Sequence, residues 1–207
     1  MNSISLVSLN VNGLNNPIKR TKIILKMRKL KAQVIFMQET HLSQEEHEKL
    51  KKFGFRNTYY STCKQSNKRG VAILIQNSTK FECLKEIKDT EGRYIIVKGK
   101  LQEEMVTLIN VYAPPESTKQ FFKSLFPVMA LKSEGIVICA GDFNMIMDHR
   151  VDTTSIKRNK THISKFVNMS LKEHGLVDVW RELHPKEKDY THYSTLYNTP
   201  RPGSNSM

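Results

Sequence analysis

The 207-residue sequence contains no long apolar run. Its longest uninterrupted apolar stretches are 71–75 and 136–140, whereas a helix that spans a membrane needs about 20 apolar residues. Serines and an asparagine interrupt the first ten residues, and no basic residue precedes them. We therefore expect no membrane partner and no secretory signal.

Cysteine is scarce as well. The chain has only Cys63, Cys83 and Cys139, and no two of them are spaced as in a CxxC motif. An odd, scattered set of cysteines argues against a disulfide scaffold and against a structural zinc site. An intracellular, reducing compartment therefore fits this chain better than secretion does.

Acidic residues are missing from the first part of the chain. None occurs before Glu39, while seven Lys or Arg residues lie between positions 19 and 31. The whole chain has 33 basic and 20 acidic residues, a formal net charge of +13, which favours an acidic polymer as a partner. A basic helix face is also often only solvated, so that alternative stays open. The residues of this stretch that we expect to contact nucleic acid are Lys22, Lys26 and Lys29.

Short apolar segments rich in β-branched residues alternate with turn signals, which predicts many strands with interspersed helices. We expect strands at 4–9, 34–37, 70–75, 94–97, 105–112 and 136–140. Helical spacing predicts helices at about 18–30, 118–131 and 161–174, with Ser117 capping the second and Gly175 ending the third. With no internal repeat and no linker, the pattern indicates one α/β domain over residues 1–199, followed by an unstructured tail at 200–207.

Polar clusters follow four of the predicted strands, at 9–13, 37–41, 110–114 and 140–144. Strand ends with loops beyond them are the usual position of an active site on a rigid sheet. Glu39 and Asn10 offer the hard oxygen ligands that magnesium prefers. Asp142 would orient or deprotonate a water molecule, as phosphoester hydrolysis requires. A single Asp or Asn after a strand is more often a turn or cap residue, so the prediction depends on all four clusters together.

The motifs L-N-V-N-G, Q-E-T-H, G-V-A-I-L, N-V-Y-A-P and G-D-F-N, in this order, resemble the endonuclease/exonuclease/phosphatase superfamily. The stretches 14–20, 89–94 and 183–191 make the resemblance closest to the endonuclease domain of the second open reading frame of LINE-type non-LTR retrotransposons. The similar region covers residues 3–198. The resemblance implies a DNase I-like, four-layered α/β sandwich, in which helices flank two packed β-sheets.

The resemblance also implies an activity, which is magnesium-dependent cleavage of a phosphodiester bond, with manganese as an alternative ion. In the retrotransposon branch the substrate is double-stranded DNA, which is nicked to prime reverse transcription. Matched by motif, Asn10 and Glu39 fall on the metal-site residues, with Asn12 beside them in support. From this resemblance we expect the protein to be a monomer located in the nucleus.

The remaining site residues are carried over from the family in the same way. Tyr112 matches the phosphate-contacting tyrosine, and Asp142 and Asn144 match the pair that positions the nucleophile and stabilises the transition state. Thr191 falls where the family approaches the DNA backbone, although it fits an ordinary strand threonine equally well. Related domains often carry an arginine just after the aspartate at 152, where this sequence has a threonine. We expect Arg150, together with Lys157, to compensate as a DNA contact.

The sequence departs from the family in one respect. The family continues with a Ser-Arg-Ile-Asp-like strand and later a Ser-Asp-His motif, whose histidine lies closest to the scissile phosphate. Neither motif occurs in the 207 residues, and a Pro-Arg-Pro-Gly stretch at 200–203 stands where the strand is expected. We expect surface or capping positions for the seven histidines that are present. The expectation is a truncated domain that lacks its last strands and is an impaired enzyme.

Three functions are compatible with the sequence. The first is a retrotransposon-type endonuclease, and the second is an AP endonuclease or exonuclease III-like repair nuclease. The third is a catalytically dead remnant that binds nucleic acid by charge alone. The Leu-His-Pro and Asn-Asn-Pro-Ile-Lys-Arg stretches favour the first function over the second.

Overall fold

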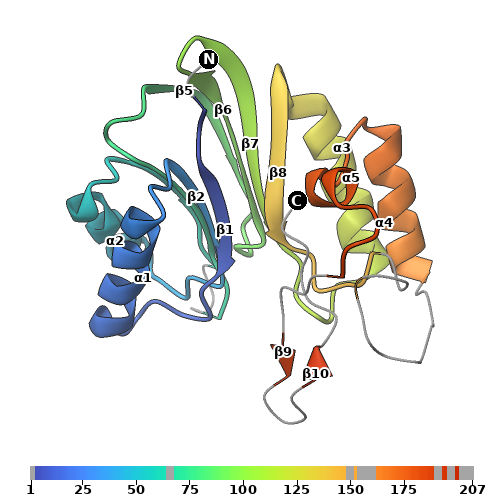
Figure 1. Cartoon of the computed structure of the whole chain (residues 1–207), viewed down its shortest axis with the longest axis horizontal. Helices are drawn as coiled ribbons and strands as arrows, with labels where there is room; N and C mark the ends of the chain where they lie inside the picture. The colour runs from blue at the N-terminus through green and yellow to red at the C-terminus, as the bar shows by residue number, and fades with distance from the viewer. Residues whose placement is uncertain are drawn as a thin grey trace. The chain divides into compact units, whose positions relative to one another are not determined.

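The computed structural model describes residues 3–63, 68–147, 152, 162–188, 193–194 and 199–200 (Figure 1). The chain divides into two compact units. The first unit comprises Met1–Tyr112 and Glu134–Gly141, and the second comprises Ala113–Ser133 and the chain from Asp142 onwards. None of the helices in the described ranges is long and apolar enough to cross a membrane. The single boundary expected at residue 199 stays a prediction.

The first unit contains two four-stranded sheets. The first sheet has the order β1-β2-β4-β3 and consists of β1 (Leu6–Asn10), β2 (Val34–Gln38), β3 (Asn57–Ser61) and β4 (Val71–Ile75). Strands β1 and β2 run parallel, whereas β4 is antiparallel to both β2 and β3. The second sheet has the order β5-β6-β7-β8 and consists of β5 (Phe81–Lys88), β6 (Tyr94–Leu101), β7 (Glu104–Tyr112) and β8 (Ile136–Asp142).

Close backbone contacts at two glycines show in which direction β8 runs relative to β7. A Cβ atom on Gly135 would meet the carbonyl of Met105, and one on Gly141 would lie 2.0 Å from the carbonyl oxygen of Val111. Both segments therefore advance in the same direction, and β8 runs parallel to β7. Because Gly141 also has a φ of +156°, only glycine fits at this position. This glycine allows β8 to lie close against β7 just before its last residue, Asp142.

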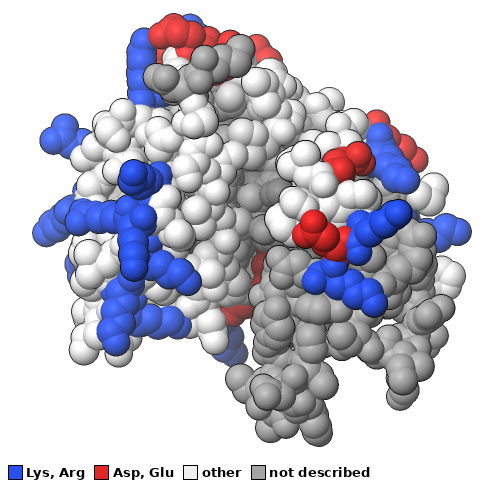
Figure 2. All heavy atoms as spheres, viewed as in Figure 1, with Lys and Arg blue, Asp and Glu red and all other residues white. Residues whose placement is uncertain are grey.

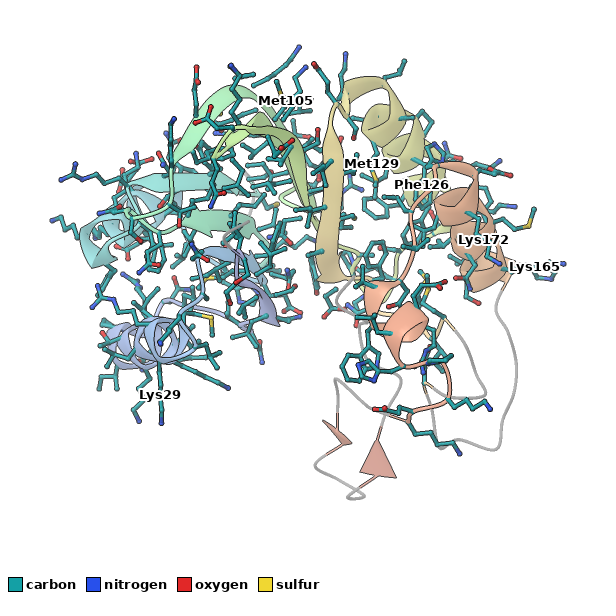
Figure 3. All side chains as sticks on the ribbon, turned by 45° about the horizontal axis from the view of Figure 1, so that its top comes forward. Lys29, Met105, Phe126, Met129, Lys165 and Lys172 are labelled. Carbon is teal, nitrogen blue, oxygen red and sulfur yellow. The ribbon has the colours of Figure 1, made fainter. Side chains whose placement is uncertain are left out.

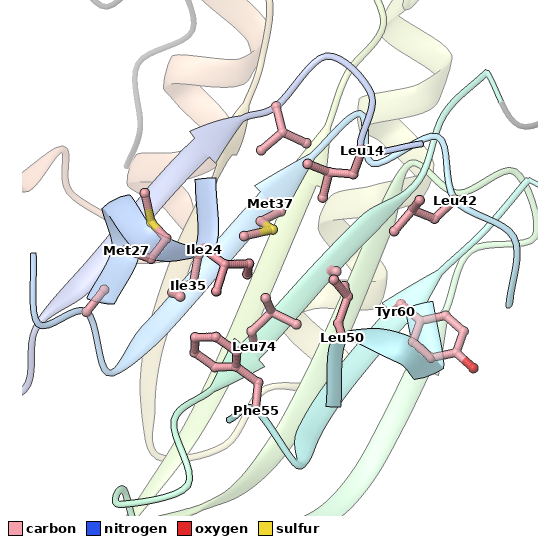
Figure 4. Packing of buried hydrophobic residues seen from close by; sticks show 13 residues of the cluster. Leu14, Ile24, Met27, Ile35, Met37, Leu42, Leu50, Phe55, Tyr60 and Leu74 are labelled. Atoms are coloured by element: carbon pink, nitrogen blue, oxygen red, sulfur yellow. The ribbon is translucent and has the colours of Figure 1, made fainter. Parts of the chain in front are cut away.

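The core of the first unit lies on both faces of the first sheet. Strands β2 and β4 are buried along their whole length, as expected for continuous apolar runs between two layers. Val34 and Phe36 pack towards the second sheet, with residues such as Ile95 and Leu108. The alternate residues of β2 pack on the opposite face with the helices (Figure 4). The period of two in a strand thus divides the core into two clusters.

Helix α1 (Pro17–Lys29) covers the first sheet in this second cluster. The side chain of Asn16 caps it by accepting hydrogen bonds from the next backbone N–H groups, and a proline occupies its first turn. Ile24 and Met27 are buried against the sheet (Figure 4), so the helix turns its lysines to solvent. A short helix, α2 (Gln44–Lys49), and a 3₁₀ turn, η1 (Leu50–Phe53), complete this layer.

The described helices of the second unit are α3 (Lys119–Lys132), α4 (His162–Glu173) and α5 (Val179–Leu183). Aromatic contacts join the first two helices, because the Phe126 ring lies 6.3 Å from Phe166 and 5.6 Å from His174. Figure 3 labels Phe126 on α3 and shows Lys165 and Lys172 extending outwards from α4. The helix α4 ends before Gly175, whose φ of +67° fits the expected stop.

The structure confirms the expected α/β class, with two β-sheets and flanking helices. Two local expectations were wrong. The N-cap of α3 is Thr118 rather than Ser117, and its side chain makes no capping hydrogen bond. Pro200, expected in the tail, pairs with Tyr193 in two short antiparallel strands, β9 (Tyr193–Ser194) and β10 (Thr199–Pro200). Residues 201–207 lie outside the described part of the chain.

Candidate functional site

Asn10 and Glu39, the two predicted metal residues, lie side by side at the ends of parallel strands β1 and β2. Asn10 is in register with Gln38, so Glu39 is the first residue beyond the sheet. The Nδ2 group of Asn10 donates a 2.8 Å hydrogen bond to Oε1 of Glu39. The Oδ1 atom of Asn10 accepts a 3.0 Å hydrogen bond from the backbone N–H of Asn12. The structure thus brings together all three residues that were predicted around the metal.

The backbone around this cluster is strained. Asn12, Glu39 and His41 have φ values of +42°, +50° and +54°, a conformation that costs roughly 1–3 kcal/mol per residue. Backbone hydrogen bonds hold it, because Gly13 donates to the carbonyl of Glu39 at 2.7 Å and His41 donates to that of Arg69 at 3.1 Å. Strain of this kind at strand ends is typical of a functional site.

His41 occupies a position that the sequence did not predict. Its Nε2 atom lies 3.3 Å from Oε2 of Glu39, and this nitrogen is buried with no hydrogen-bond partner among the described residues. Only 24% of its side chain is exposed. The expectation of a surface or capping histidine was therefore wrong for His41, because its left-handed backbone turns the ring towards the carboxylate.

The same expectation was wrong for His47, which is fully buried. Its Nε2 atom lies 3.0 Å from the hydroxyl of Thr40, and its Nδ1 atom lies 2.9 Å from the carbonyl of Ser43. The ring stacks on Tyr60 with 4.5 Å between centroids. Burial lowers the pKa of His47 to about 4, so the ring is neutral near pH 7.

A buried amide pair joins the two sheets directly behind these residues. Gln38 Nε2 donates a 2.7 Å hydrogen bond to Oδ1 of Asn110. The Nδ2 group of Asn110 donates to the carbonyls of Met37 and Ala72 at 2.9 and 2.8 Å. Sequence reasoning gave Asn110 no role, although a polar residue inside the apolar strand L-I-N-V-Y was a signal for one. The pair fixes the ends of β2 and β7, which carry two of the predicted site residues.

Tyr112 ends β7 and is 6% exposed. Its backbone N–H donates to the carbonyl of Arg93 at 2.6 Å. The guanidinium of Arg93 forms two hydrogen bonds to Asp89, with Nε at 2.8 Å and the second nitrogen at 3.0 Å. This contact raises the pKa of Arg93 above its ordinary value. The D-T-E-G-R-Y stretch therefore supports the chain at Tyr112 through an ion pair.

Asp142 and Asn144 lie together in the second unit. The Oδ1 atom of Asp142 accepts a 2.9 Å hydrogen bond from the backbone N–H of Asn144. Ala113, the residue after Tyr112 in the chain, donates its N–H to the carbonyl of Asp142 at 2.8 Å and accepts from Nδ2 of Asn144 at 3.0 Å. Asp142 is 6% exposed, and Asn144 has a φ of +48°. A buried, oriented carboxylate and a fixed amide are what the predicted chemistry requires.

The three lysines expected to contact nucleic acid are exposed on α1. Lys22, Lys26 and Lys29 share one face by helical spacing, and basic side chains gather over this helix in Figure 2. Lys29 points away from the sheets in Figure 3. Arg20 differs, because it is buried and forms a 2.6 Å ion pair with Glu46. The other expected contacts, Arg150, Lys157 and Thr191, lie outside the described residues.

The donor set at the strand ends fits magnesium. In the part of the chain that the structure describes, no group of three or more His, Cys, Asp or Glu side chains is arranged to hold a metal. Magnesium needs no such cage, because it usually keeps several waters and takes one or two carboxylates together with substrate phosphate. The Glu39 carboxylate, which is 21% exposed, and the neighbouring Asn10 amide meet that requirement.

The second unit also contains a cavity of about 590 Å³. Residues of α4 and α5 line it, among them Asn168, Lys172 and Arg181. None of the predicted site residues is part of this lining. Its Arg181 forms a 2.8 Å ion pair with the buried Asp152, which is a structural contact. We therefore keep the strand-end residues as the candidate site.

Sequence comparison finds two matches over most of the chain. The family described as Endonuclease/Exonuclease/phosphatase matches residues 7–206. The transposon TX1 uncharacterized 149 kDa protein of Xenopus laevis is 31% identical over 200 residues, which make up 92% of this chain. This chain spans 14% of the length of that relative.

Solved structures share the fold. An AP endonuclease from Archaeoglobus fulgidus has a TM-score of 0.73 and 21% identity, over 98% of this chain and 85% of that one. The endonuclease domain of TRAS1, a telomere-specific non-LTR retrotransposon, has a TM-score of 0.60 and 13% identity, over 84% of this chain and 71% of that one. At these identities the likeness is one of architecture.

Proposed function

This chain belongs to the Endonuclease/Exonuclease/phosphatase family, and from that premise we propose that it hydrolyses phosphodiester bonds in double-stranded DNA with the help of a divalent cation. The sequence identity to a transposon protein supports the retrotransposon branch of the family. The observation that carries the proposal is the contact between Asn10 and Glu39 at the ends of two parallel strands.

Glu39 and Asn10 are the residues that would hold magnesium. When bound, the ion supplies positive charge to the phosphate oxygens and activates a water molecule. Glu39 contributes a negative charge that attracts the dication. Asn10 orients the Glu39 carboxylate through the 2.8 Å hydrogen bond. Asn12 supports the arrangement, because its backbone N–H holds the Asn10 amide.

Asp142 would position the attacking water and accept its proton. The backbone N–H of Asn144 holds one of its oxygens, so the carboxylate keeps a single orientation. The Asn144 amide carries two N–H groups, of which one donates to Ala113 and the other would donate to the phosphate. Tyr112 would donate a further hydrogen bond to the charge that develops on phosphorus.

The DNA backbone would be attracted by the exposed lysines of α1, namely Lys22, Lys26 and Lys29, and contacted by Arg150 and Thr191. Each phosphate neutralised by a lysine or arginine releases counterions, which makes binding favourable and dependent on salt. We propose that the protein acts as a monomer and in the nucleus, where its substrate is found.

The chain contains neither a Ser-Arg-Ile-Asp-like nor a Ser-Asp-His motif. In the family the latter motif supplies a histidine close to the scissile phosphate. A positioned catalytic group commonly contributes about 10²- to 10⁴-fold to the rate. We therefore expect residues 1–207, taken alone, to cleave DNA slowly.

Nicking of supercoiled plasmid tests the proposal. Residues 1–207 should nick the plasmid slowly with magnesium and not at all with EDTA. Glu39→Gln should abolish nicking, whereas Glu45→Gln, which changes an exposed carboxylate of α2, should not. Preference for an abasic duplex over an intact one would indicate a repair nuclease instead. Binding of DNA without any nicking would overturn the proposal and indicate a non-enzymatic remnant.

A further inference from the structure

The imidazole of His41 faces the carboxylate that is proposed to hold the metal. Its Nε2 atom lies 3.3 Å from Oε2 of Glu39. This nitrogen is buried and has no hydrogen-bond partner among the described residues. Buried polar atoms almost always have a partner, so an exception at a candidate site requires an explanation.

The fold holds the ring at this position. His41 and Glu39 both have left-handed backbone conformations, with φ values of +54° and +50°. The N–H of His41 donates to the carbonyl of Arg69 at 3.1 Å, which ties this turn to the segment before β4. On the other side of the ring lies Gly13, where a Cβ atom would be 3.2 Å from Nδ1 of His41. The ring is therefore placed by its backbone and by close packing.

The spacing of the polar atoms is that of ligands which share an ion. Two adjacent ligands at right angles, each about 2.1 Å from a metal, lie about 3 Å apart. The distance from Nε2 of His41 to Oε2 of Glu39 is 3.3 Å, and the Asn10 amide nitrogen donates a 2.8 Å hydrogen bond to the other carboxylate oxygen. Nε2 of His41 and Oε2 of Glu39 are thus at ligand spacing, while the hydrogen bond from Asn10 holds the carboxylate in place.

We propose that His41 is a third metal ligand, which adds an imidazole nitrogen to the oxygen donors of Glu39 and Asn10. The proposal rests on the proposed function, because it assumes that Glu39 binds a divalent cation. Imidazole nitrogen binds transition-metal ions more readily than it binds magnesium, which prefers oxygen. The site therefore binds Mn²⁺ more tightly than Glu39 and Asn10 alone would, and His41 affects Mg²⁺ less.

The alternative is that His41 only positions Glu39 through a hydrogen bond. Both roles would be disturbed by His41→Ala, so affinity alone does not separate them. Detecting a direct bond between a histidine nitrogen and the metal separates the two roles, because pulsed EPR of bound Mn²⁺ detects a coordinated ¹⁴N nucleus. Labelling histidine with ¹⁵N changes that signal only if the nitrogen belongs to a histidine.

The experiment uses residues 1–207 loaded with Mn²⁺ and no DNA. We expect a histidine nitrogen signal in the unsubstituted protein and its loss in His41→Ala, with Mn²⁺ affinity at least about 10-fold weaker. The control is His184→Ala, which removes the partner of Glu187 in the second unit and should keep both the signal and the affinity. If His41→Ala does not fold, His41→Gln replaces it, because ¹⁵N labelling identifies a histidine ligand but not which of the seven histidines it is.

The outcomes separate the two proposals. Bound Mn²⁺ without a histidine nitrogen signal would overturn the role of His41, as would a signal that survives in folded His41→Ala. The proposed function would still stand if Glu39→Gln lost Mn²⁺ binding in the same assay. If Glu39→Gln bound Mn²⁺ as tightly as the unsubstituted protein, the metal site itself would be wrong and His41 would lose its role with it.

Discussion

Gln38 and Asn110 form a 2.7 Å hydrogen bond that joins the two sheets of the first unit through their fully buried side chains. Asn110 also donates to the carbonyls of Met37 and Ala72, so this one side chain of β7 satisfies three polar groups on β2 and β4. A buried polar group that loses its partner costs about 1–3 kcal/mol. The amide pair is therefore important for stability as well as for the position of Glu39.

We predict that Asn110→Ala lowers the free energy of unfolding by about 2 kcal/mol, because two carbonyls lose the Asn110 donor and Gln38 keeps only its 3.1 Å hydrogen bond to Ser8. Urea unfolding followed by circular dichroism measures the change. The matched control is Asn15→Ala at an exposed position, which should stay within about 0.5 kcal/mol. An equally small change for Asn110→Ala would mean that the buried pair contributes little.

The sequence predicts the four interior strands of the two four-stranded sheets, whereas it misses two of their four edge strands, β3 and β5. Strand β4, V-A-I-L-I, is buried along its whole length, so its apolar run identifies it. Strand β5, F-E-C-L-K-E-I-K, lies at the edge of its sheet and is mostly exposed. Its polar composition therefore resembles that of a loop, and the sequence pattern did not predict it. The charged residues of an edge strand protect it from pairing with other chains.

The candidate site was likewise predictable only in part: the sequence predicted Glu39 and Asn10 but not the role of His41. The position of Glu39 one residue beyond β2, next to the end of parallel β1, follows from strand patterning and explains its contact with Asn10. The contact between His41 and Glu39 depends on left-handed backbone at both residues. Such conformations are uncommon outside glycine, so the letters Q-E-T-H gave no signal for them.

We predict that Asp142→Asn slows nicking by about 10²- to 10⁴-fold, because an amide does not accept the proton of the attacking water. Asparagine keeps an oxygen for the backbone N–H of Asn144, so the fold and DNA affinity should change little. Plasmid nicking, DNA binding and thermal melting are compared with those of Glu173→Gln, an exposed change on α4. A normal rate in Asp142→Asn would remove this carboxylate from the mechanism.

We predict that replacing Lys22, Lys26 and Lys29 together by glutamine weakens DNA binding. The slope of log K against log salt should fall by up to about 0.9 for each phosphate that a lysine no longer neutralises. Fluorescence anisotropy of a labelled duplex at several salt concentrations measures the slope.

The control for the lysine prediction removes the same charge from scattered positions. Lys52, Lys100 and Lys123 are exposed on η1, β6 and α3. Substituting these three by glutamine should leave the slope nearly unchanged. If the slope fell equally in both triple variants, net charge alone would explain binding, and the α1 face would be only solvated.

The last prediction concerns His47 and acid. Burial is the main cause that lowers its pKa from 6.5 to about 4, and the positive charges of Arg20 and Lys88 add to it. The bond to the carbonyl of Ser43 and the charge of Glu48 act in the opposite direction. Since the neutral ring donates from Nδ1 to that carbonyl, Nε2 accepts the hydroxyl proton of Thr40.

Because the folded protein keeps His47 neutral, the unfolded chain binds more protons between pH 6.5 and pH 4. The contribution of this residue to stability is complete above pH 6.5 and decreases as the pH falls to about 4, by a total of about 3 kcal/mol.

We expect His47→Gln to be less stable at pH 7, because the stacking on Tyr60 is removed, and to show a flatter decline with acid. His162→Gln, at an exposed position of α4, should keep the original slope in urea unfolding at each pH. An unchanged slope in His47→Gln would show that other groups cause the acid sensitivity, because a glutamine side chain does not titrate in this range.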